Sequence, residues 1–520
     1  MRLLILTHAF NGLSQRLYVE LAARGHELSV EFDVNDSVTR EAVDLFRPDA
    51  VIAPFMKRAI PPEVWQRVPC LIVHPGIVGD RGPSALDWAI QEGEREWGVT
   101  VLAATAEFDG GPVWATANFP MRAAPKSSLY RGEVTQAAVA TVLEALDALA
   151  AGRKPVPAAA LAPRGRGRPL LRKEDRRIDW AHHDTAAVLA RIHAGDGFPG
   201  VRDEVLGLPV HLFGAWADAP RPGAEPGSVI ATRDGAILRA TTDGSVWITH
   251  LREQSAEPRL KLPATQVLGE RLAGVPELPV DDALGATGWR EIVYERRGDV
   301  GLLRFEFHNG AMSTAQCQRL AAAIEAAGRQ PTRVLVLLGG REFWANGIHL
   351  GMIEASGAAA DESMRNIEAM NDACRAIVTL QSQWVIAAMR GNAAAGGVFL
   401  ALGADEVVAR EGIVLNPHYK NMGNLYGSEY WTYLLPRRVG KAGVAAVMEN
   451  RLPIGVHSAC ALGLIDAGLP GTAEAFEAEV LERAAKFSEN PQYEAKMTEK
   501  RVRREADEAA RPLQQYRDDE

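Results

Sequence analysis

Apolar runs alternate with amphipathic stretches along the first 160 residues. Two segments have helical periodicity, one ending near Arg24 and one spanning 127–151. Runs of five or six apolar residues are typical of buried strands, and their alternation with helices favours a parallel α/β sheet. The apolar runs occupy 2–7, 28–32, 50–55, 71–74 and 98–102. We therefore expect an α/β domain over residues 1–160.

The pattern changes over residues 161–275, where short strands with alternating polarity follow one another. They lie at 208–213, 228–231, 236–240 and 245–249. Several short strands separated by turn residues predict a small β-barrel-like domain. A basic run from Arg164 to Arg177 precedes them. Such a run is usually a solvated linker, and the alternative is a clamp for phosphate groups.

A third pattern begins near residue 290, after an expected linker at 274–287. Apolar strands at 300–307, 334–338, 385–389 and 406–409 alternate with helical segments at 314–327 and 362–381. We expect a further α/β domain over 290–490. Charged residues dominate 491–520, which predicts a solvated helix that packs only weakly on the rest.

Composition narrows the possible functions. The chain has 520 residues, a net charge of −9 and 24% charged residues, so no electrostatic case exists for binding nucleic acid. The four cysteines are widely spaced and form no CxxC pair, and we expect no metal site. The sequence has no apolar run of about 18 residues, so we expect no membrane span. The first six residues read as a strand and not a signal peptide, so the expected location is the cytoplasm.

Two titratable residues stand near the ends of predicted strands. His74 ends the run 71–74, and Asp109 follows the run 98–102. A histidine held by a carboxylate can take up or deliver a proton near neutral pH. The simpler interpretation is a strand-end histidine that caps a loop.

The segment 74–88, "QEGEREWGVTV" (91–101) and "AEFDGGPVW" (106–114) resemble the folate-dependent formyltransferase family. The resemblance covers about residues 1–265. It implies a Rossmann-like domain followed by a barrel-like one, in which His74 and Asp109 act on the formyl group of 10-formyltetrahydrofolate. The family carries Asn two residues before the histidine, where this chain has Ile72. Another donor must then polarise the formyl oxygen, or the transfer is altered.

A loop after the run 50–55 is a second candidate for the folate site. Phe55, Met56 and Ile60 would line an apolar slot for a flat pterin ring, or else simply anchor the loop. Gly82, in the loop after His74, is assigned with them to the folate site.

"FWANGIHL" (343–350) and "GNAAAGGVFLALGAD" (391–405) resemble the crotonase family of enoyl-CoA hydratases and isomerases, with its ββα spiral fold. The resemblance implies an oxyanion hole made by the amides of Ile348 and Gly396. Two preorganised donors of this kind stabilise a thioester oxygen as it gains negative charge. Ala345 and Gly347 would contact CoA. The alternative is that the glycines serve only helix–strand packing.

Phe399 and His418 stand where the family's hydratases have catalytic carboxylates, so hydration of an enoyl-CoA is not expected. A polar and aromatic cluster follows at 416–431. Within it, Glu429 and a nearby tyrosine form a candidate proton-transfer pair, and we assign Tyr426 to it. Arg166 and Arg172 are the candidates for the CoA phosphates.

"HAFNGLSQR" (8–16), "FHNGAMST" (307–314) and the segment 416–431 are similar to a family of hydrogenase maturation proteins that joins both kinds of domain. That similarity implies formyl transfer from 10-formyltetrahydrofolate to CoA, then decarbonylation of formyl-CoA to give carbon monoxide for a NiFe hydrogenase. Partners would be small molecules and possible hydrogenase maturation proteins. Two alternatives remain open: a formyltransferase that makes formyl-CoA without decarbonylation, and a non-catalytic scaffold.

Overall fold

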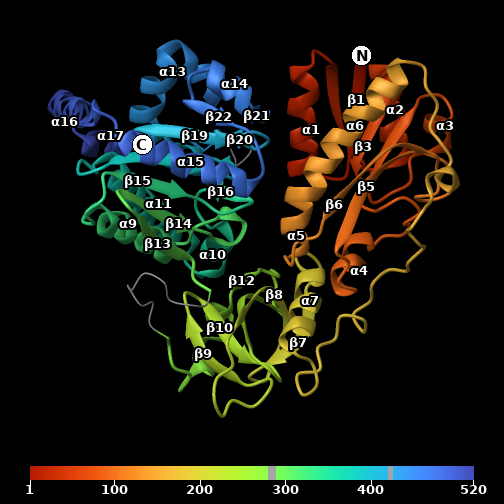
Figure 1. The fold of residues 1–520 in the computed structure, drawn as a ribbon, viewed down its shortest axis with the longest axis horizontal. Helices are drawn as coiled ribbons and strands as arrows, with labels where there is room; N and C mark the ends of the chain where they lie inside the picture. The colour runs from red at the N-terminus through yellow and green to blue at the C-terminus, as the bar shows by residue number, and fades with distance from the viewer. Residues whose placement is uncertain (279–288, 420–424) are drawn as a thin grey trace. The chain divides into compact units, whose positions relative to one another are not determined.

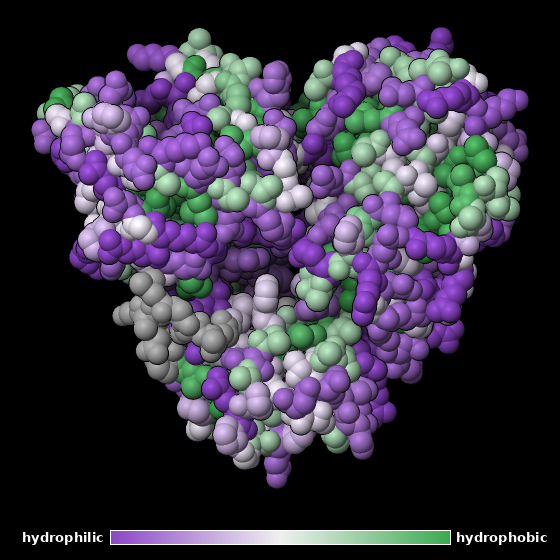
Figure 2. Space-filling model, in the orientation of Figure 1, coloured by the Kyte–Doolittle hydropathy of each residue, from purple (hydrophilic) through white to green (hydrophobic). Residues whose placement is uncertain are grey.

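The computed structural model describes residues 1–278, 289–419 and 425–520. The chain forms two compact units, Met1–Leu278 and Pro279–Glu520 (Figure 1). Figure 2 shows polar side chains (purple) over most of the visible surface of both units. Among the described residues, no helix is both long and apolar enough to span a bilayer. Most of the expected linker at 274–287, and positions 420–424 of the polar cluster, lie outside the described residues.

Six strands form the first sheet of the N-terminal unit, in the order β2-β1-β3-β4-β5-β6. Their bounds are β1 (Arg2–Thr7), β2 (Glu27–Phe32), β3 (Ala50–Phe55), β4 (Cys70–His74), β5 (Glu96–Ala103) and β6 (Val113–Pro120). The pairs among β1 to β4 are parallel, whereas β5 runs antiparallel to both β4 and β6. The strand alternation predicts a parallel sheet, and that prediction is correct only for the first four strands.

The reversal at β5 has a simple geometric cause. A parallel neighbour requires a crossover that returns the chain to the starting edge of the sheet. Here the segment after His74 stays at the end of β4, and Thr100 of β5 lies opposite His74. The loop 75–84 therefore remains beside the histidine and leads into the short helix α4 (Ala85–Gln91).

Helices cover both faces of this sheet. One apolar core lies between the strands and the helices α1 (Gly12–Ala23) and α6 (Thr135–Ala150). A second apolar core lies between the strands and the helices α2 (Asp36–Phe46) and α3 (Pro62–Trp65). The helix expected over 127–151 begins as α5 (Lys126–Leu129) and passes through a π-helical turn, Tyr130–Val134, before α6. From Val134 to Leu146 its apolar positions recur every four residues and are buried, as the periodicity predicts, and Leu149 at its end is partly buried.

The second sheet of this unit is antiparallel, in the order β7-β8-β11-β10-β9, with β12 paired to β11. The strands are β7 (Val201–Val205), β8 (Leu208–Asp218), β9 (Val229–Arg233), β10 (Ala236–Ala240), β11 (Ser245–Glu253) and β12 (Leu262–Pro263). α7 (Thr185–Gly195) and α8 (Ala264–Leu268) bury their apolar faces against it. Among these described strands β7 and β9 are edges, so the sheet is open and not a closed barrel.

The C-terminal unit contains two sheets, ordered β13-β14-β15-β17-β19-β22 and β16-β18-β20-β21. The strands are β13 (Ile292–Arg297), β14 (Val300–Phe305), β15 (Val334–Leu338), β16 (Phe343–Ala345), β17 (Trp384–Met389), β18 (Asn392–Ala394), β19 (Glu406–Arg410), β20 (Val414–Asn416), β21 (Ile454–Gly455) and β22 (Ala467–Leu469). From β15 to β20, successive strands alternate between the sheets, which is the expected ββα spiral.

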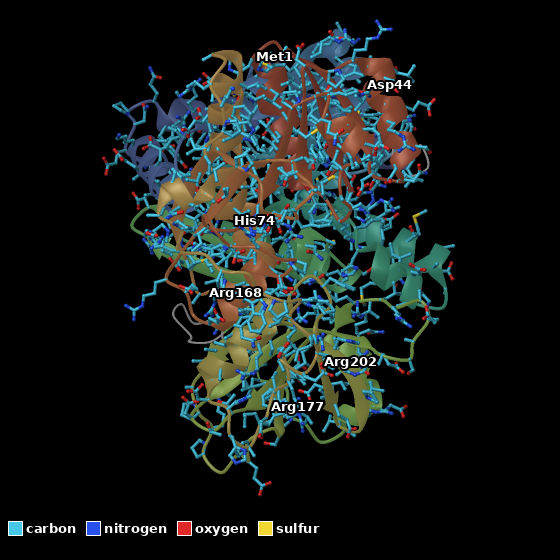
Figure 3. All side chains as sticks on the ribbon, turned by 90° about the vertical axis from the view of Figure 1, so that its right-hand side faces the viewer. Met1, Asp44, His74, Arg168, Arg177 and Arg202 are labelled. Carbon is cyan, nitrogen blue, oxygen red and sulfur yellow. The ribbon has the colours of Figure 1, made fainter. Side chains whose placement is uncertain are left out.

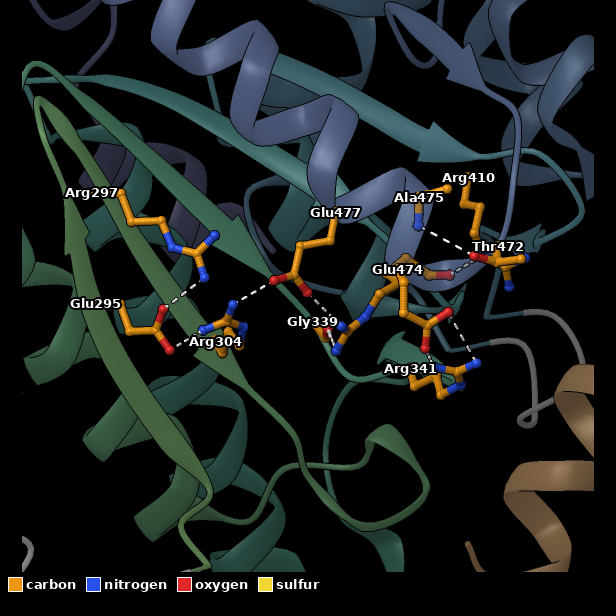
Figure 4. Close-up of polar contacts among 11 residues, drawn as sticks. Glu295, Arg297, Arg304, Gly339, Arg341, Arg410, Thr472, Glu474, Ala475 and Glu477 are labelled. Carbon is orange, nitrogen blue, oxygen red and sulfur yellow. Dashed lines mark hydrogen bonds and ion pairs between the residues drawn. The ribbon is translucent and has the colours of Figure 1, made fainter. Parts of the chain in front are cut away.

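Helices pack on both sheets of this unit. They are α9 (Thr314–Gly328), α10 (Leu350–Ala355), α11 (Ala359–Val378), α12 (Gly396–Leu402), α13 (Trp431–Met448), α14 (Val456–Ala461), α15 (Ala473–Ser488), α16 (Tyr493–Ala510) and α17 (Leu513–Asp519). α15 is tied to the larger sheet by Glu477, which contacts Arg304 at 2.5 Å and Arg390 at 2.9 Å (Figure 4). These ion pairs therefore fix α15 to β14 and to the end of β17.

The C-terminal helices pack more closely than their charge predicts. Lys500 of α16 is only 5% exposed, and its ammonium donates to Asp405 at 2.6 Å and to the Gln383 carbonyl at 2.7 Å. The expectation of a weakly packed, solvated helix was wrong because this buried cation satisfies groups at strand ends that the charge pattern alone cannot reveal.

We predict that Lys500→Ala lowers the free energy of unfolding by roughly 3–5 kcal/mol, because it leaves the buried Asp405 carboxylate with the more distant and exposed Arg503, 3.6 Å away, as its cation. Lys496→Ala is the matched control, since Lys496 pairs with exposed Glu499, and it should cost under about 1 kcal/mol. Urea unfolding followed by circular dichroism measures both. Equal effects would mean that α16 is not anchored through Lys500.

Two candidate active sites

His74 lies at the end of β4 between two carboxylates. Its Nε2 is 3.0 Å from Asp80 Oδ2, and its Nδ1 is 3.4 Å from Asp109 Oδ1. The residue is 4% exposed. The structure thus brings His74 and Asp109 together as the sequence suggests, and adds a second anion that sequence analysis missed.

These contacts set the protonation of the histidine. Burial lowers the pKa of His74, but hydrogen bonds to Asp109 and Asp80 raise it more strongly, to about 9. Burial raises the pKa of Asp109, but the hydrogen bond and charge of His74, the Gly82 amide and the charge of Arg81 together outweigh this, so the pKa lies below its ordinary value. At neutral pH the resting imidazole is therefore a cation that can donate a hydrogen bond or a proton.

Asp80 is itself held by a member of the basic run. Arg168 donates to Asp80 Oδ1 at 3.1 Å and to Glu92 at 2.6 Å, and its guanidinium lies 5.4 Å from the centre of the Trp97 ring. Figure 3 labels Arg168 and His74 in the same region of the N-terminal unit. Arg168 thus orients the carboxylate that contacts His74. In the sequence, Asp80 stands out only as an acidic residue in the glycine-rich loop, and Arg168 is one of several arginines in the basic run.

Glycines make this close packing possible. A side chain on Gly76 would lie 2.4 Å from His74 Nε2, and one on Gly82 would lie 2.2 Å from the Arg168 carbonyl. Gly82 also has a positive φ of 121° and donates its amide to Asp109 at 3.2 Å. Gly82, assigned to the folate site by sequence, therefore supports the candidate catalytic carboxylate directly.

The other expected folate residues lie on or after β3. Phe55 is half-buried, with its ring centre 6.1 Å from that of His8 and 6.3 Å from that of Tyr130. Ile60 is 5% exposed and belongs to a core that also contacts Met56 and Ile72. This burial favours loop anchoring for Ile60.

Ile72 is on the same strand face as His74, because side chains two residues apart in a strand share a face.

The remaining arginines of the basic run are mostly paired within the same unit. Arg166 contacts Glu92 at 2.9 Å, Arg176 contacts Asp87 at 2.9 Å, and Arg164 forms an ion pair with Glu96. Arg172 is exposed. The pairing favours the linker interpretation for Arg166 over a phosphate clamp.

We predict that the imidazole of His74 stays protonated at neutral pH and titrates near pH 9 in an NMR pH titration. Asp80→Asn should lower this pKa, because it removes one of the two anions that stabilise the imidazolium. Glu107→Gln is the control, since Glu107 pairs with Arg81 at the surface. A His74 titration near 6.5 in the unaltered protein would contradict this account.

The second candidate site lies in the C-terminal unit, where two backbone amides approach each other. Ile348 follows β16, and Gly396 begins α12. A side chain on Gly347, which has a φ of 81°, would lie 3.5 Å from the Gly396 amide nitrogen. Within the described residues neither amide, that of Ile348 or that of Gly396, donates a hydrogen bond. Two neighbouring free donors are the arrangement that stabilises a developing oxyanion.

The start of α12 is pressed against β16. A side chain on Gly397 would lie 2.1 Å from the Ala345 carbonyl oxygen, and the Trp344 indole donates to the Gly397 carbonyl at 2.8 Å. Ala345 is fully buried. Both interpretations of the glycines therefore hold at once, since Gly397 serves packing while Gly396 leaves its amide free.

A carboxylate fills the space beside Gly396. A side chain on Gly396 would lie 2.1 Å from Glu429 Oε1, and Tyr419 donates to Glu429 Oε2 at 2.5 Å. Glu429 is 3% exposed. The structure thus places the Glu429 carboxylate directly beside the candidate oxyanion hole.

Burial raises the pKa of Glu429 to about 7, and the hydrogen bonds from Tyr419 and Ser428 lower it only in part. Burial and the neighbouring Glu429 charge raise the pKa of the Tyr419 hydroxyl well above its ordinary value. Glu429 therefore exchanges a proton near neutral pH, whereas Tyr419 remains a hydrogen-bond donor.

Tyr426, the tyrosine assigned by sequence, is 59% exposed and packs on Trp431, with ring centres 5.3 Å apart. The structure does not bring it to Glu429. Phe399 stacks on Tyr419 with ring centres 5.9 Å apart, so an aromatic ring occupies the place of a hydratase carboxylate. Tyr419, which stands in the same polar cluster, is the tyrosine that meets the carboxylate.

We predict a pH-dependent difference in stability between the unaltered protein and Glu429→Gln. The folded-state pKa of about 7 exceeds the ordinary value, so stability relative to the variant should fall as pH rises from about 4.5 to 7. The fall should total roughly 3 kcal/mol, since each pKa unit is about 1.4 kcal/mol. Denaturant titrations at pH 4.5 and 8 measure it. A constant difference would show that the carboxyl titrates normally.

Three comparisons with known proteins bear on these sites. The family "Enoyl-CoA hydratase/isomerase" matches residues 299–520, "Formyl transferase" matches 25–146, and "Formyl transferase, C-terminal domain" matches 170–260. The chain is 52% identical to the hydrogenase maturation factor HoxX of Bradyrhizobium diazoefficiens, covering 100% of this chain and 90% of that protein. It is 28% identical over 239 residues to a methionyl-tRNA formyltransferase of Ralstonia pickettii, covering 44% of this chain and 71% of that protein.

Among solved structures, that of HypX from Aquifex aeolicus in complex with tetrahydrofolic acid is 48% identical. It matches with a TM-score of 0.96, covering 100% of this chain and 91% of that one.

Proposed function

Because this chain belongs to the family of the hydrogenase maturation factor HoxX, with formyltransferase and enoyl-CoA hydratase/isomerase domains, we propose that it makes carbon monoxide for a NiFe hydrogenase. It transfers formyl from 10-formyltetrahydrofolate to CoA and decarbonylates the formyl-CoA. Tetrahydrofolic acid in the structure of the HypX relative supports the identity of the donor. CoA is inferred from the enoyl-CoA hydratase/isomerase domain.

The first step occurs at His74. The CoA sulfur attacks the formyl carbon, the bond from that carbon to N10 of the folate breaks, and the thiol proton ends on N10. At rest both ring nitrogens of His74 face carboxylates, so the longer contact, from Nδ1 to Asp109 at 3.4 Å, opens when the folate binds. That N–H then donates to the formyl oxygen or delivers its proton to N10, while Asp80 holds the ring through Nε2 and Asp109 stabilises its charge. A charged imidazole can supply the donor that formyltransferases obtain from an Asn, so it compensates for Ile72.

The second step occurs at the amides of Ile348 and Gly396. They polarise the formyl-CoA carbonyl, and Glu429 removes the formyl proton. The C–H electron pair stays on carbon as the C–S bond breaks, with its electrons leaving on sulfur. The products are carbon monoxide and CoA thiolate, which takes back a proton. Tyr419 keeps Glu429 in place by donating to its other oxygen.

One observation carries this proposal: a fully buried carboxylate with a pKa of about 7 lies against the glycine whose amide is free. A scaffold without turnover has no use for such a group, because burying a carboxylate costs stability when, as among the described residues, no cation neutralises it. A hydratase would need the carboxylates that Phe399 and His418 replace. General-base removal of a proton from a bound thioester is the chemistry that remains.

We predict that the protein, given 10-formyltetrahydrofolate and CoA, releases carbon monoxide to a haem trap. Glu429→Gln should reduce this release by roughly 100-fold or more, because it removes the general base. Tyr419→Phe should lower it less, and Tyr426→Phe is the matched control that should leave it unchanged.

The outcomes separate the alternatives. Formyl-CoA that accumulates without carbon monoxide would indicate a formyltransferase alone. No formyl transfer at all, with His74→Ala as active as the unaltered protein in hydrogenase maturation, would indicate a scaffold.

A further inference from the structure

Glu429 and Tyr430 have an unusual backbone conformation. Their φ values are 63° and 56°, in the left-handed region that residues with side chains rarely adopt. Such conformations persist only where the surrounding structure fixes them, and they concentrate at functional sites. The turn that aims the Glu429 carboxylate at Gly396 must therefore be held by specific neighbours.

One neighbour is α11, which holds the backbone of Glu429 itself. Asn371 accepts the Glu429 amide at 2.8 Å, and the Cys374 thiol lies 3.3 Å from the Glu429 carbonyl oxygen. Both side chains are buried. These contacts fix the first of the two left-handed residues but not the second.

The second residue is held by Glu520. One carboxylate oxygen of Glu520 accepts the Tyr430 amide at 2.9 Å, and the other accepts the Thr432 amide at 2.9 Å and the Thr432 hydroxyl at 2.6 Å. The Tyr430 side chain makes no capping bond at the start of α13. Glu520 thus supplies, from a distant part of the chain, the cap that this helix start lacks.

Glu520 is held firmly enough to act in this way. It follows α17, in which Leu513 is 3% exposed. Arg517 of the same helix donates to Asp372 at 2.6 Å and also pairs with Glu368, both on α11. α11 therefore supports Glu429 directly and, through α17, supports the residue after it.

We propose that Glu520 is a positioning residue for the proposed decarbonylation: its carboxylate locks the turn 429–432 and so keeps Glu429 beside the Gly396 amide. The inference rests on the proposed function for its effect on turnover. Glu520 also acts through charge. Among the described residues, the titratable groups that face Glu429 are Tyr419, Cys317, Cys374 and Glu520. Of these, Glu520 alone is a carboxylate, and its charge raises the pKa of Glu429.

Two substitutions separate the roles of shape and charge. Glu520→Gln keeps the size and one accepting oxygen but loses the charge, so the pKa of Glu429 should fall. Glu520→Ala removes the cap, so kcat for carbon monoxide release should drop at least tenfold with little change in KM. Asp518→Asn is the matched control, because it removes one negative charge from α17 at an exposed residue that accepts a hydrogen bond from Gln514 on the same helix.

Infrared titration of the Glu429 carboxyl, identified by its loss in Glu429→Gln, reports the pKa without turnover. A lower pKa in Glu520→Gln and an unchanged one in Asp518→Asn support the inference, even in a preparation that makes no carbon monoxide. An unchanged Glu429 titration in Glu520→Gln overturns it, as does an unaltered kcat in Glu520→Ala. If Glu520→Ala fails to fold, Glu520→Gln decides alone.

Discussion

The C-terminal unit depends on one close packing contact, the Glu429 carboxylate in the space where Gly396 has no side chain. A methyl group there would lie 2.1 Å from a carboxylate oxygen. The same absence leaves the Gly396 amide open to a ligand. Burial of the carboxylate disfavours its charged form, and this is why its pKa rises to about 7. The position of the Glu429 carboxylate and its raised pKa therefore both follow from the missing side chain at Gly396.

The two candidate sites use opposite electrostatics. His74 is surrounded by the anions Asp80 and Asp109, which favour the protonated imidazole. Burial of Glu429 and the charge of Glu520 favour its protonated carboxyl, and the hydrogen bonds from Tyr419 and Ser428 oppose them only in part. Formyl transfer to a thiol needs a donor near the folate, and removal of a formyl proton needs a base. The two environments supply one group of each kind at neutral pH.

Much of the architecture could be predicted from the sequence, because it depends on local patterns. Apolar runs marked the strands, and the glycines of 391–397 marked the turn into α12. His74, Asp109, Ile348, Gly396 and Glu429 were all named from motifs. Their roles remain proposals, since they rest on geometry and resemblance.

What the sequence could not reveal depends on contacts between distant residues. Asp80 and Arg168 are 88 positions apart, and their ion pair exists only once the basic run crosses the loop 75–84. The sequence does not distinguish Tyr419 from Tyr426, which are the same residue type in the same cluster. In the fold Tyr419 contacts Glu429, whereas Tyr426 is exposed. Lys500 and Glu520 stand in a charged segment that looks solvated by composition. Apart from Tyr419, which is 10 positions from Glu429, each of these buried polar groups has a partner far along the chain.

The most direct test of the account supplies the proposed intermediate itself. Purified protein is given synthetic formyl-CoA labelled with carbon-13 at the formyl carbon, without any folate, and the gas phase is analysed by mass spectrometry. The account requires labelled carbon monoxide in step with free CoA, and its loss in Glu429→Gln. Labelled formate as the sole carbon product, or equal carbon monoxide from both proteins, would contradict it.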